Sequence, residues 1–243
     1  MRTIAILFVV LVGACSGTQS QGVADRPPSL SVAQAALAGG APDVALKICS
    51  DALQHQPGNL AAQICEGDAL AALGRRADAE TSFERAQKLS PDDRGVLMGL
   101  GRLRLATDAQ AAEALFQHVL NITPDNAEAW NDIGIARDLQ GRHQEAQLAY
   151  GRALGLVPDM RAAEVNLALS MAMSGHADEA VTRLRRLASD PAASPKLRQD
   201  LAAALAMADK PDEAAKLLRG DLSPEQIDQA IAGYHALSAP PAK

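Results

Sequence analysis

The strongest constraint on this chain is one register of alanine residues that recurs along its whole length. The alanines are 34 residues apart, with one interval of 33: Ala45, Ala79, Ala112, Ala146, Ala180 and Ala214. Four positions after each stands a larger residue: Cys49, Phe83, Phe116, Tyr150, Leu184 and Leu218. Eleven or twelve positions before each stands a small one: Ala33, Gly67, Gly101, Gly134, Ala168 and Ala202. A fixed period of this length predicts stacked copies of one supersecondary unit.

The single short interval locates a deletion in the third copy. Gly67 to Gly101 spans 34 residues, but Gly101 to Ala112 is one residue shorter than its counterparts, so the deletion falls in the stretch LATDAQ. Other copies carry a glycine here: Gly40, Gly74, Gly141 and Gly175. We predict a turn between two helices at this point, because a deletion inside a helix would rotate its apolar face.

The fourth copy resembles the tetratricopeptide repeat, a helix-turn-helix unit of 34 residues. The signature positions of that family are occupied by Trp130, Ile133, Gly134, Gly141, Ala146, Tyr150, Ala153 and Pro158. The resemblance implies an all-α superhelical solenoid of about six helix-turn-helix repeats. The units are predicted over 29–59, 60–93, 94–126, 127–160, 161–194 and 195–221.

A further helix is predicted after the last repeat, over residues 222–237. Ser223 suits the N-cap, Pro224 suits the first helical position, and Gln226 completes a capping box. This helix would cover the exposed end of the array, as terminal elements of solenoids do. Residues 238–243 are predicted to be a disordered tail.

Several groups in the fourth unit could take part in chemistry: Asp132, Arg137, Asp138, His143, Glu145 and Tyr150. The repeat explains them without catalysis, since Tyr150 takes a packing position and the acids fall on solvated faces or turn caps. The five histidines show no pair at zinc-site spacing, and the chain has no phosphate-binding loop. We therefore predict no catalytic residue, no metal, no cofactor and no small-molecule substrate.

The first residues, MRTIAILFVVLVGAC, combine a basic start with a short apolar run and a small-residue exit. This pattern predicts a signal peptide over 1–14. The end, Val12 to Cys15, resembles the bacterial lipobox, which implies a diacylated Cys15 at the start of a polar tether over 15–28. Ser16 is compatible with the outer membrane, so we expect the protein on the periplasmic face of that membrane in a Gram-negative bacterium. The alternative is an ordinary signal peptide with an incidental cysteine.

Charge and cysteine content narrow the function further. The formal net charge is −6 and aromatic residues make up 2%, without a basic stripe, which argues against nucleic-acid binding. Two cysteines remain in a compartment that permits disulfides. Cys49 takes a core position and Cys65 a position expected to face the groove, so we expect the two to point in different directions rather than bond.

The concave surface of such a solenoid is formed by the first helix of each unit. The predicted groove residues mix apolar and polar groups, and are Asp68, Met98, Arg102, Asn131, Ile135, Asp138, Val165, Leu169, Met173, Gln199 and Met207. Methionine adapts to varied shapes, so the groove is expected to bind a peptide segment or helix of a partner protein. The alternative is that these are ordinary surface residues.

The lipobox, the repeats and the runs NDIGIARDLQGRHQEAQLAYGRAL and VNLALSMAMSGHADEA resemble a narrower family. This family is the TadD-type tetratricopeptide lipoproteins of tight-adherence (Flp) pilus systems. The resemblance implies a scaffold that helps the secretin channel to localise and assemble. Other adaptors stay open: a type IV pilus pilotin, an outer-membrane-protein assembly lipoprotein, or an adaptor for a periplasmic protease or cell-wall hydrolase.

Overall fold

The computed structural model describes residues 29–190 and 194–237, and in these residues all regular structure is α-helical. The predicted all-α repeat fold is therefore confirmed. The helices are α1 (Leu30–Ala38), α2 (Pro42–His55), α3 (Leu60–Ala72), α4 (Arg76–Leu89), α5 (Arg94–Arg104), α6 (Ala109–Ile122), α7 (Ala127–Leu139), α8 (His143–Leu156), α9 (Arg161–Met173), α10 (Ala177–Ala188), α11 (Pro195–Met207), α12 (Pro211–Leu218) and α13 (Pro224–Leu237). The predicted signal peptide, Cys15, the tether and the tail lie outside the described residues.

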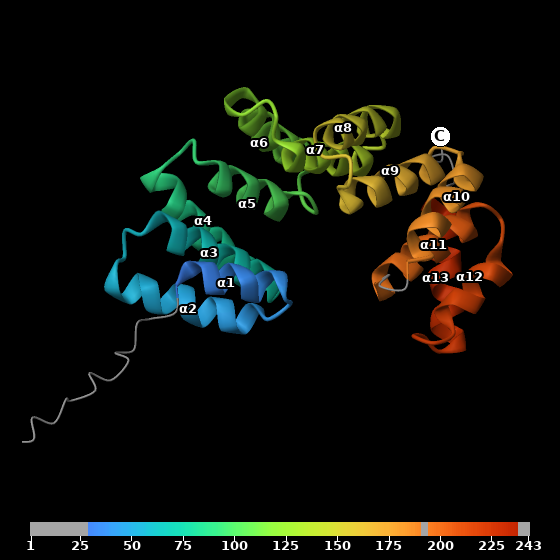
Figure 1. The fold of residues 1–243 in the computed structure, drawn as a ribbon, viewed down its shortest axis with the longest axis horizontal. Helices are drawn as coiled ribbons and strands as arrows, with labels where there is room; N and C mark the ends of the chain where they lie inside the picture. The colour runs from blue at the N-terminus through green and yellow to red at the C-terminus, as the bar shows by residue number, and fades with distance from the viewer. Residues whose placement is uncertain (1–28, 191–193, 238–243) are drawn as a thin grey trace, which may run out of the picture.

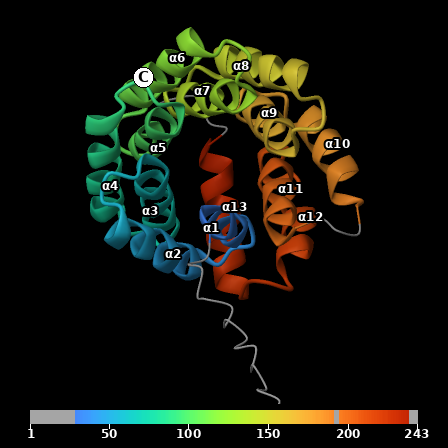
Figure 2. The same cartoon turned by 60° about the vertical axis from the view of Figure 1, so that its left-hand side comes forward.

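The helices form a curved, two-layered array (Figure 1). The odd-numbered helices α3, α5, α7, α9 and α11 lie on the inner side of the curve, and the even-numbered helices α4, α6, α8 and α10 lie on the outer side (Figure 2). Each predicted unit contains one helix of each layer. None of the described helices is both long and apolar enough to cross a bilayer.

Close packing between the two helices of a unit depends on the predicted small residues. A Cβ atom added to Gly134 would lie 2.4 Å from Cε1 of Tyr150, and one added to Gly101 would lie 2.4 Å from Cε1 of Phe116. The aromatic ring thus occupies the volume that any larger residue would need. The alanine of the register is also completely buried, as Ala146 shows. The repeat pattern in the sequence is a packing pattern.

The turn inside each unit explains the glycines and the deletion. Gly40, Gly74, Gly141 and Gly175 have φ between +73° and +91°, a conformation that costs glycine little. In the third unit α5 has 11 residues where α7 has 13. Its turn, 105–108, contains no residue with positive φ. The one-residue deletion therefore coincides with a shorter end of α5 and a turn without glycine, and it leaves the packed face in register.

Two ends of the array are closed in different ways. At the C-terminal end α13 packs against α11 through Ile227 and continues the inner layer. Its predicted capping box is present, because the backbone N–H of Ser223 donates to Oε1 of Gln226 at 2.9 Å. At the N-terminal end α1 packs on α2 and α3.

The expectation for the two cysteines was wrong. Cys49 of α2 and Cys65 of α3 form a disulfide, with their Cα atoms 6.0 Å apart. The physical reason is visible one unit later, where Gly99 takes the position of Cys65 and Phe83 that of Cys49. A Cβ added to Gly99 would lie 2.2 Å from the Phe83 ring. The position of Cys65 therefore faces the preceding unit and not the groove.

Candidate protein-binding groove

The predicted groove residues occupy three positions on the first helices: three before the small residue of the register, one after it, and four or five after it. The structure separates these positions. The first position is buried, since Met98, Asn131 and Val165 are only 4%, 5% and 8% exposed. Their prediction as outward-facing contacts was wrong, because successive first helices pack over this position. Gln199 holds the same position in α11 and is half-buried.

The second and third positions are less buried, and they belong to the inner-layer helices. Arg102 is exposed, while Ile135, Leu169, Met173 and Met207 are half-buried. We call the last four the inner apolar strip. Their side chains come from three consecutive first helices, α7, α9 and α11, so the strip crosses three units. A half-buried apolar strip on a concave surface can receive the apolar side chains of a peptide without a change in the fold.

Asn131 has a structural role that the sequence did not reveal. Its Oδ1 accepts a hydrogen bond from Nδ2 of Asn166 at 2.9 Å, and its own Nδ2 donates to Oδ1 of Asp132 at 3.1 Å. The bond from Asn166 joins α9 to α7, and the bond to Asp132 lies within α7. The side-chain amide of Asn131 therefore hydrogen-bonds to other residues of the protein and is not free to bind a partner.

The Asp138 carboxylate also hydrogen-bonds within the protein. It is therefore neither the solvated side chain nor the free groove residue that the sequence predicted. It accepts hydrogen bonds from the Tyr150 hydroxyl at 2.9 Å and from Ser170 Oγ at 2.7 Å, and Nδ1 of His143 lies 2.8 Å from its Oδ1. These groups come from α8 and α9, so one carboxylate ties three helices together. Burial, followed by the neighbouring Asp138, raises the pKa of Tyr150, which keeps the phenol a donor.

The grouping of Asp138, His143 and Ser170 does not form a catalytic triad. The Ser170 hydroxyl donates to the carboxylate instead of to the imidazole, and Ser170 is completely buried. A nucleophilic serine requires a base on its own hydroxyl and access to a substrate. The arrangement accounts for the polar residues of the fourth unit as ties between helices.

Arg102 connects the inner surfaces of the third and fourth units. Its Nε donates to Oδ2 of Asp132 at 2.7 Å, and its Nη2 lies 3.6 Å from Glu128. Asp132 is buried, contrary to the expectation of a solvated face. Burial raises the pKa of Asp132, while the Arg102 guanidinium acts in the opposite direction. The guanidinium remains exposed on its other side, where it can also meet a ligand.

A pocket of about 520 Å³ lies beside Arg102 at the junction of α3, α4 and α5. Asp68, Gly99 and Phe83 are among its lining residues. Burial raises the pKa of Asp68 to about 6, and Arg102 opposes that rise. At Gly99 the Phe83 ring takes the space of a side chain and forms part of the pocket wall, whereas the equivalent position in the next unit is Asp132.

The geometry can be compared with known proteins. The tetratricopeptide-repeat family profile matches residues 36–103, and a second profile of the same family matches residues 115–148. No curated protein sequence is significantly similar to the chain.

Three solved structures share the fold at low sequence identity. A tetratricopeptide-repeat protein from Parabacteroides merdae has a TM-score of 0.67 at 15% identity, over 85% of this chain and 82% of that one. PilW, described as a type IV pilus biogenesis factor, has a TM-score of 0.67 at 21% identity, over 84% and 96%. Pseudomonas aeruginosa pilF has a TM-score of 0.61 at 12% identity, over 84% and 95%.

The shared register, the turn geometry and the two profile matches agree on one assignment. The described residues contain helix pairs joined by tight turns, and in units two to four the small residue of the first helix packs on the aromatic ring of the second. The chain is a tetratricopeptide-repeat protein with an all-α solenoid fold.

Proposed function

We propose that this protein is a lipid-anchored adaptor that binds a subunit of a pilus secretin and helps the channel to assemble. The observation that carries the proposal is the inner apolar strip of Ile135, Leu169, Met173 and Met207, four half-buried residues of the inner-layer helices α7, α9 and α11 (Figure 2). Its half-buried aliphatic groups and the adjacent Arg102 suit a helix or extended segment. Scaffolding through this face requires no catalytic group.

The fold likeness supports a role in pilus assembly. PilW is described as a type IV pilus biogenesis factor and has a TM-score of 0.67 with this chain. The sequence resemblance to tight-adherence lipoproteins supports the same class of machine. The likeness to PilW also favours the alternative of a type IV pilus pilotin, and the two differ in which secretin the protein recovers from the cell.

The proposed location rests on two independent features. The lipobox ending at Cys15 would supply two or three acyl chains, and one myristoyl-sized chain alone gives only marginal binding. The Cys49–Cys65 disulfide supports a compartment outside the cytosol, because disulfides persist in oxidising environments. We therefore propose attachment to the periplasmic face of the outer membrane.

The anchor can be tested separately from the binding surface. Cys15→Ser removes the thiol that would be acylated, so the variant should leave the membrane fraction after cell breakage. A variant that still sediments with outer membranes after a high-salt wash would show that the lipid is not the attachment.

The binding surface is tested with Ile135→Glu and Leu169→Glu together. Both residues are half-buried and belong to the inner-layer helices α7 and α9, and carboxylates there should abolish apolar contacts with a partner. The matched control is Leu148→Glu, on an outer-layer residue of the same unit that is 72% exposed. Secretin multimers are compared by non-denaturing gel in wild-type cells, a deletion strain and each variant, after circular dichroism has verified folding.

We expect multimers to be lost in the deletion strain and in the double variant, and to be normal in the Leu148→Glu control. Normal multimers in the deletion strain would refute the secretin role. Loss in the deletion strain with full activity of the double variant would move the binding site away from the inner face.

A further inference from the structure

Two grooves on the outer side of the array are equivalent position by position, but their chemistry differs. One lies between α2 and α4, over α3, and the other lies between α10 and α12, over α11. Six of the nine lining residues of each groove have a counterpart 135 positions away, and the pairs are Ser50 and Arg185, Glu66 and Leu201, Leu70 and Leu205, Asp78 and Glu213, Thr81 and Lys216, and Ser82 and Leu217. The same fold therefore presents one site twice with different side chains.

The groove between α2 and α4 is closed by its own polar groups. The hydroxyls of Ser50 and Ser82 each donate to the Glu66 carboxylate at 2.9 Å, from opposite sides of the groove. The space that remains measures about 270 Å³. A carboxylate satisfied in this way has little need of a ligand.

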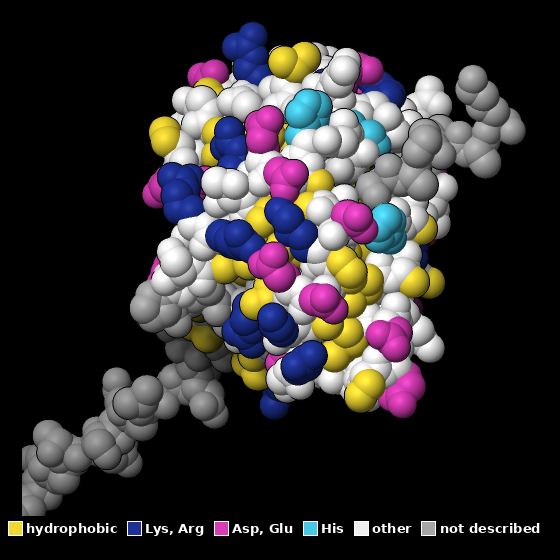
Figure 3. Space-filling model, turned by 90° about the vertical axis from the view of Figure 1, so that its right-hand side faces the viewer, with side chains coloured by type: hydrophobic (Ala, Val, Ile, Leu, Met, Phe, Trp, Pro, Cys, Tyr) yellow, Lys and Arg dark blue, Asp and Glu magenta, His cyan; other side chains and the backbone are white. Residues whose placement is uncertain are grey.

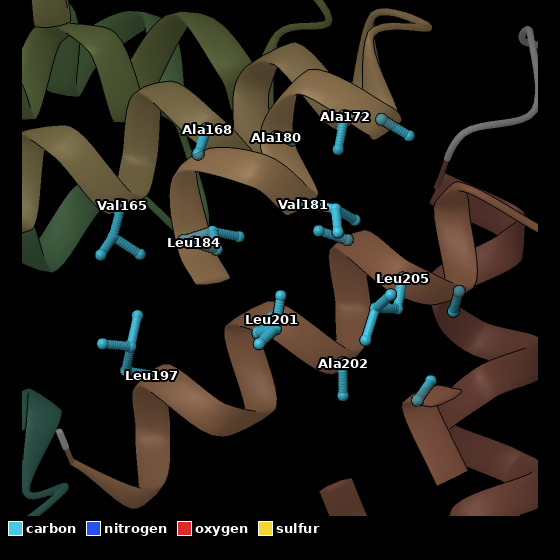
Figure 4. Packing of buried hydrophobic residues seen from close by; sticks show 14 of the residues in the cluster. Val165, Ala168, Ala172, Ala180, Val181, Leu184, Leu197, Leu201, Ala202 and Leu205 are labelled. Carbon is cyan, nitrogen blue, oxygen red and sulfur yellow. The ribbon is translucent and has the colours of Figure 1, made fainter. Parts of the chain in front are cut away.

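The groove between α10 and α12 remains open, with a volume of about 710 Å³. Its floor is apolar and consists of Leu201, Leu205, Leu217 and Ala188. Leu201 and Leu205 point toward Val181 and Leu184 of α10 (Figure 4). One reason for the open volume is that α12 has 8 residues where α4 has 14, so the outer layer is incomplete at this end.

Cationic side chains surround this apolar floor. Arg185, Arg198 and Lys216 line the groove together with one acid, Glu213. Figure 3 shows this end of the molecule, where Lys and Arg side chains gather around apolar surface. The local excess of positive charge stands out in a chain whose net charge is −6.

The three cations differ in how they are paired within the protein. Arg185 forms an ion pair with Glu213 across the groove, and Arg198 lies 3.5 Å from Asp221. Lys216 has neither a hydrogen bond nor an ion pair with any described residue, and it is exposed. An unpaired cation beside an apolar floor is complementary to a carboxylate that adjoins an aliphatic side chain.

We propose that the groove between α10 and α12 binds an acidic segment of a partner protein. Its aliphatic side chains rest on Leu201, Leu205 and Leu217, and its carboxylates pair with Lys216 and the exposed side of Arg198. This site is separate from the inner apolar strip and goes beyond the proposed secretin role. The volume lies in the range of pockets that hold a few side chains.

The probe is a synthetic ten-residue peptide, acetyl-EELLEELLEE-amide, titrated into the full-length protein by calorimetry. Two comparison peptides carry lysine in place of glutamate and serine in place of leucine. We expect measurable binding of the acidic leucine peptide, at least tenfold weaker binding of both others, and weakening by added salt. Equal binding of the lysine peptide, or no binding of the acidic one, would overturn the proposal.

Matched variants locate the site. Lys216→Glu should weaken binding at least tenfold, and Ala188→Phe should weaken it by filling the floor. Arg85→Glu makes the same charge change in the equivalent groove between α2 and α4, and should change binding by less than twofold. Equal losses in Lys216→Glu and Arg85→Glu would mean a response to overall charge and would reject the site.

A final arm replaces the peptide with vesicles that contain anionic phosphatidylglycerol. Stronger retention on these vesicles than on neutral vesicles, lost in Lys216→Glu while no acidic peptide binds, would assign the groove to a lipid surface and overturn the protein-segment proposal. Binding of the peptide without vesicle retention supports it.

Discussion

The two ends of the solenoid have the same backbone plan and are held together by different means. Around α2 to α4, a disulfide joins Cys49 to Cys65, and Glu66 accepts hydrogen bonds from two serines. Around α10 to α12, the equivalents of Cys49, Glu66 and Ser82 are Leu184, Leu201 and Leu217, which join one cluster that extends to α13. The difference shows that the small residues and the large residue of the register determine the fold, while the groove positions between units are free to vary.

Because the groove positions can vary without changing the fold, some grooves can serve stability and others can serve binding. The groove between α2 and α4 is filled by groups that hydrogen-bond to one another. These bonds stabilise the fold, and they leave the Glu66 carboxylate with no need of a ligand. In the groove between α10 and α12, the leucines of the floor pack against the core and stabilise the fold. Their exposed side and the unpaired Lys216 remain available to a partner. Each interface in a solenoid involves only neighbouring units, so one unit can change its chemistry without disturbing the others.

The largest expected effect is at the apolar end. Leu201→Ala removes a side chain that is 5% exposed and should lower the free energy of unfolding by about 2–5 kcal/mol, through lost burial and the cavity left behind. Urea denaturation followed by circular dichroism measures it. A loss under 1 kcal/mol would show that the C-terminal cluster contributes little to packing.

The next effect is at the disulfide end. Cys49→Ala with Cys65→Ala removes a cross-link between residues 16 apart and should cost about 3 kcal/mol, because the unfolded chain regains entropy. Amide hydrogen exchange should accelerate in α1 to α3 and remain unchanged in α11 to α13. Acceleration at both ends would contradict the view that the ends are independently stabilised.

A smaller effect is expected from the polar groove. Glu66→Ala leaves the buried Ser82 hydroxyl without its acceptor and should destabilise by about 1–3 kcal/mol. Glu66→Leu copies the residue of the other groove, and Ser82→Ala restores balance by removing the donor. If Ser82→Ala fails to recover any stability in the Glu66→Leu background, the hydrogen bonds are not the cause of the loss.

The smallest expected effect is a change in stability with pH. It concerns Asp68, whereas the equivalent residue in the sixth unit is Ala203, which does not titrate. Burial raises the Asp68 pKa from 3.8 to about 6, so its ionisation opposes folding. The contribution of Asp68 is thus most favourable below pH 3.8 and is lost as the pH rises through about 6.

Asp68→Asn should therefore stabilise the protein at pH 7.5 by roughly 1 kcal/mol, allowing for solvent screening, and have little effect near pH 4. Thermal melts of both proteins at several pH values measure the difference. A constant difference from pH 4 to pH 7.5 would show that Asp68 titrates normally. Ala203 offers no titrating group, so no counterpart is expected at the other end.

The sequence predicted the fold because its signals are local. The alanine register fixed the helix pairs, and the glycines at 40, 74, 141 and 175 fixed the turns. The groove was predicted less well, because its exposure depends on how units stack on one another. Met98 and Val165 lie beneath neighbouring first helices, and no periodicity within one unit reveals that.

The disulfide and the outer grooves were missed for the same physical reason. Cys65 faces Cys49 of the preceding unit, just as Gly99 faces Phe83, and such contacts between units become visible only when equivalent positions are compared in space. The Asp138 ties to Ser170 and Tyr150 also cross units or helices. The pairing of two helices can be predicted from the sequence of one repeat, whereas the residues exposed in a groove depend on contacts between repeats.

Photo-crosslinking in living cells tests the two proposed binding surfaces most directly. A benzophenone side chain is placed at Leu169 on the inner strip, at Lys216 beside the open outer groove, or at Arg85 beside the closed one. We expect a secretin adduct from position 169, a protein adduct from position 216, and none from position 85. Adducts from position 85 as strong as those from the other two, or none from position 169, would contradict the proposed binding surfaces.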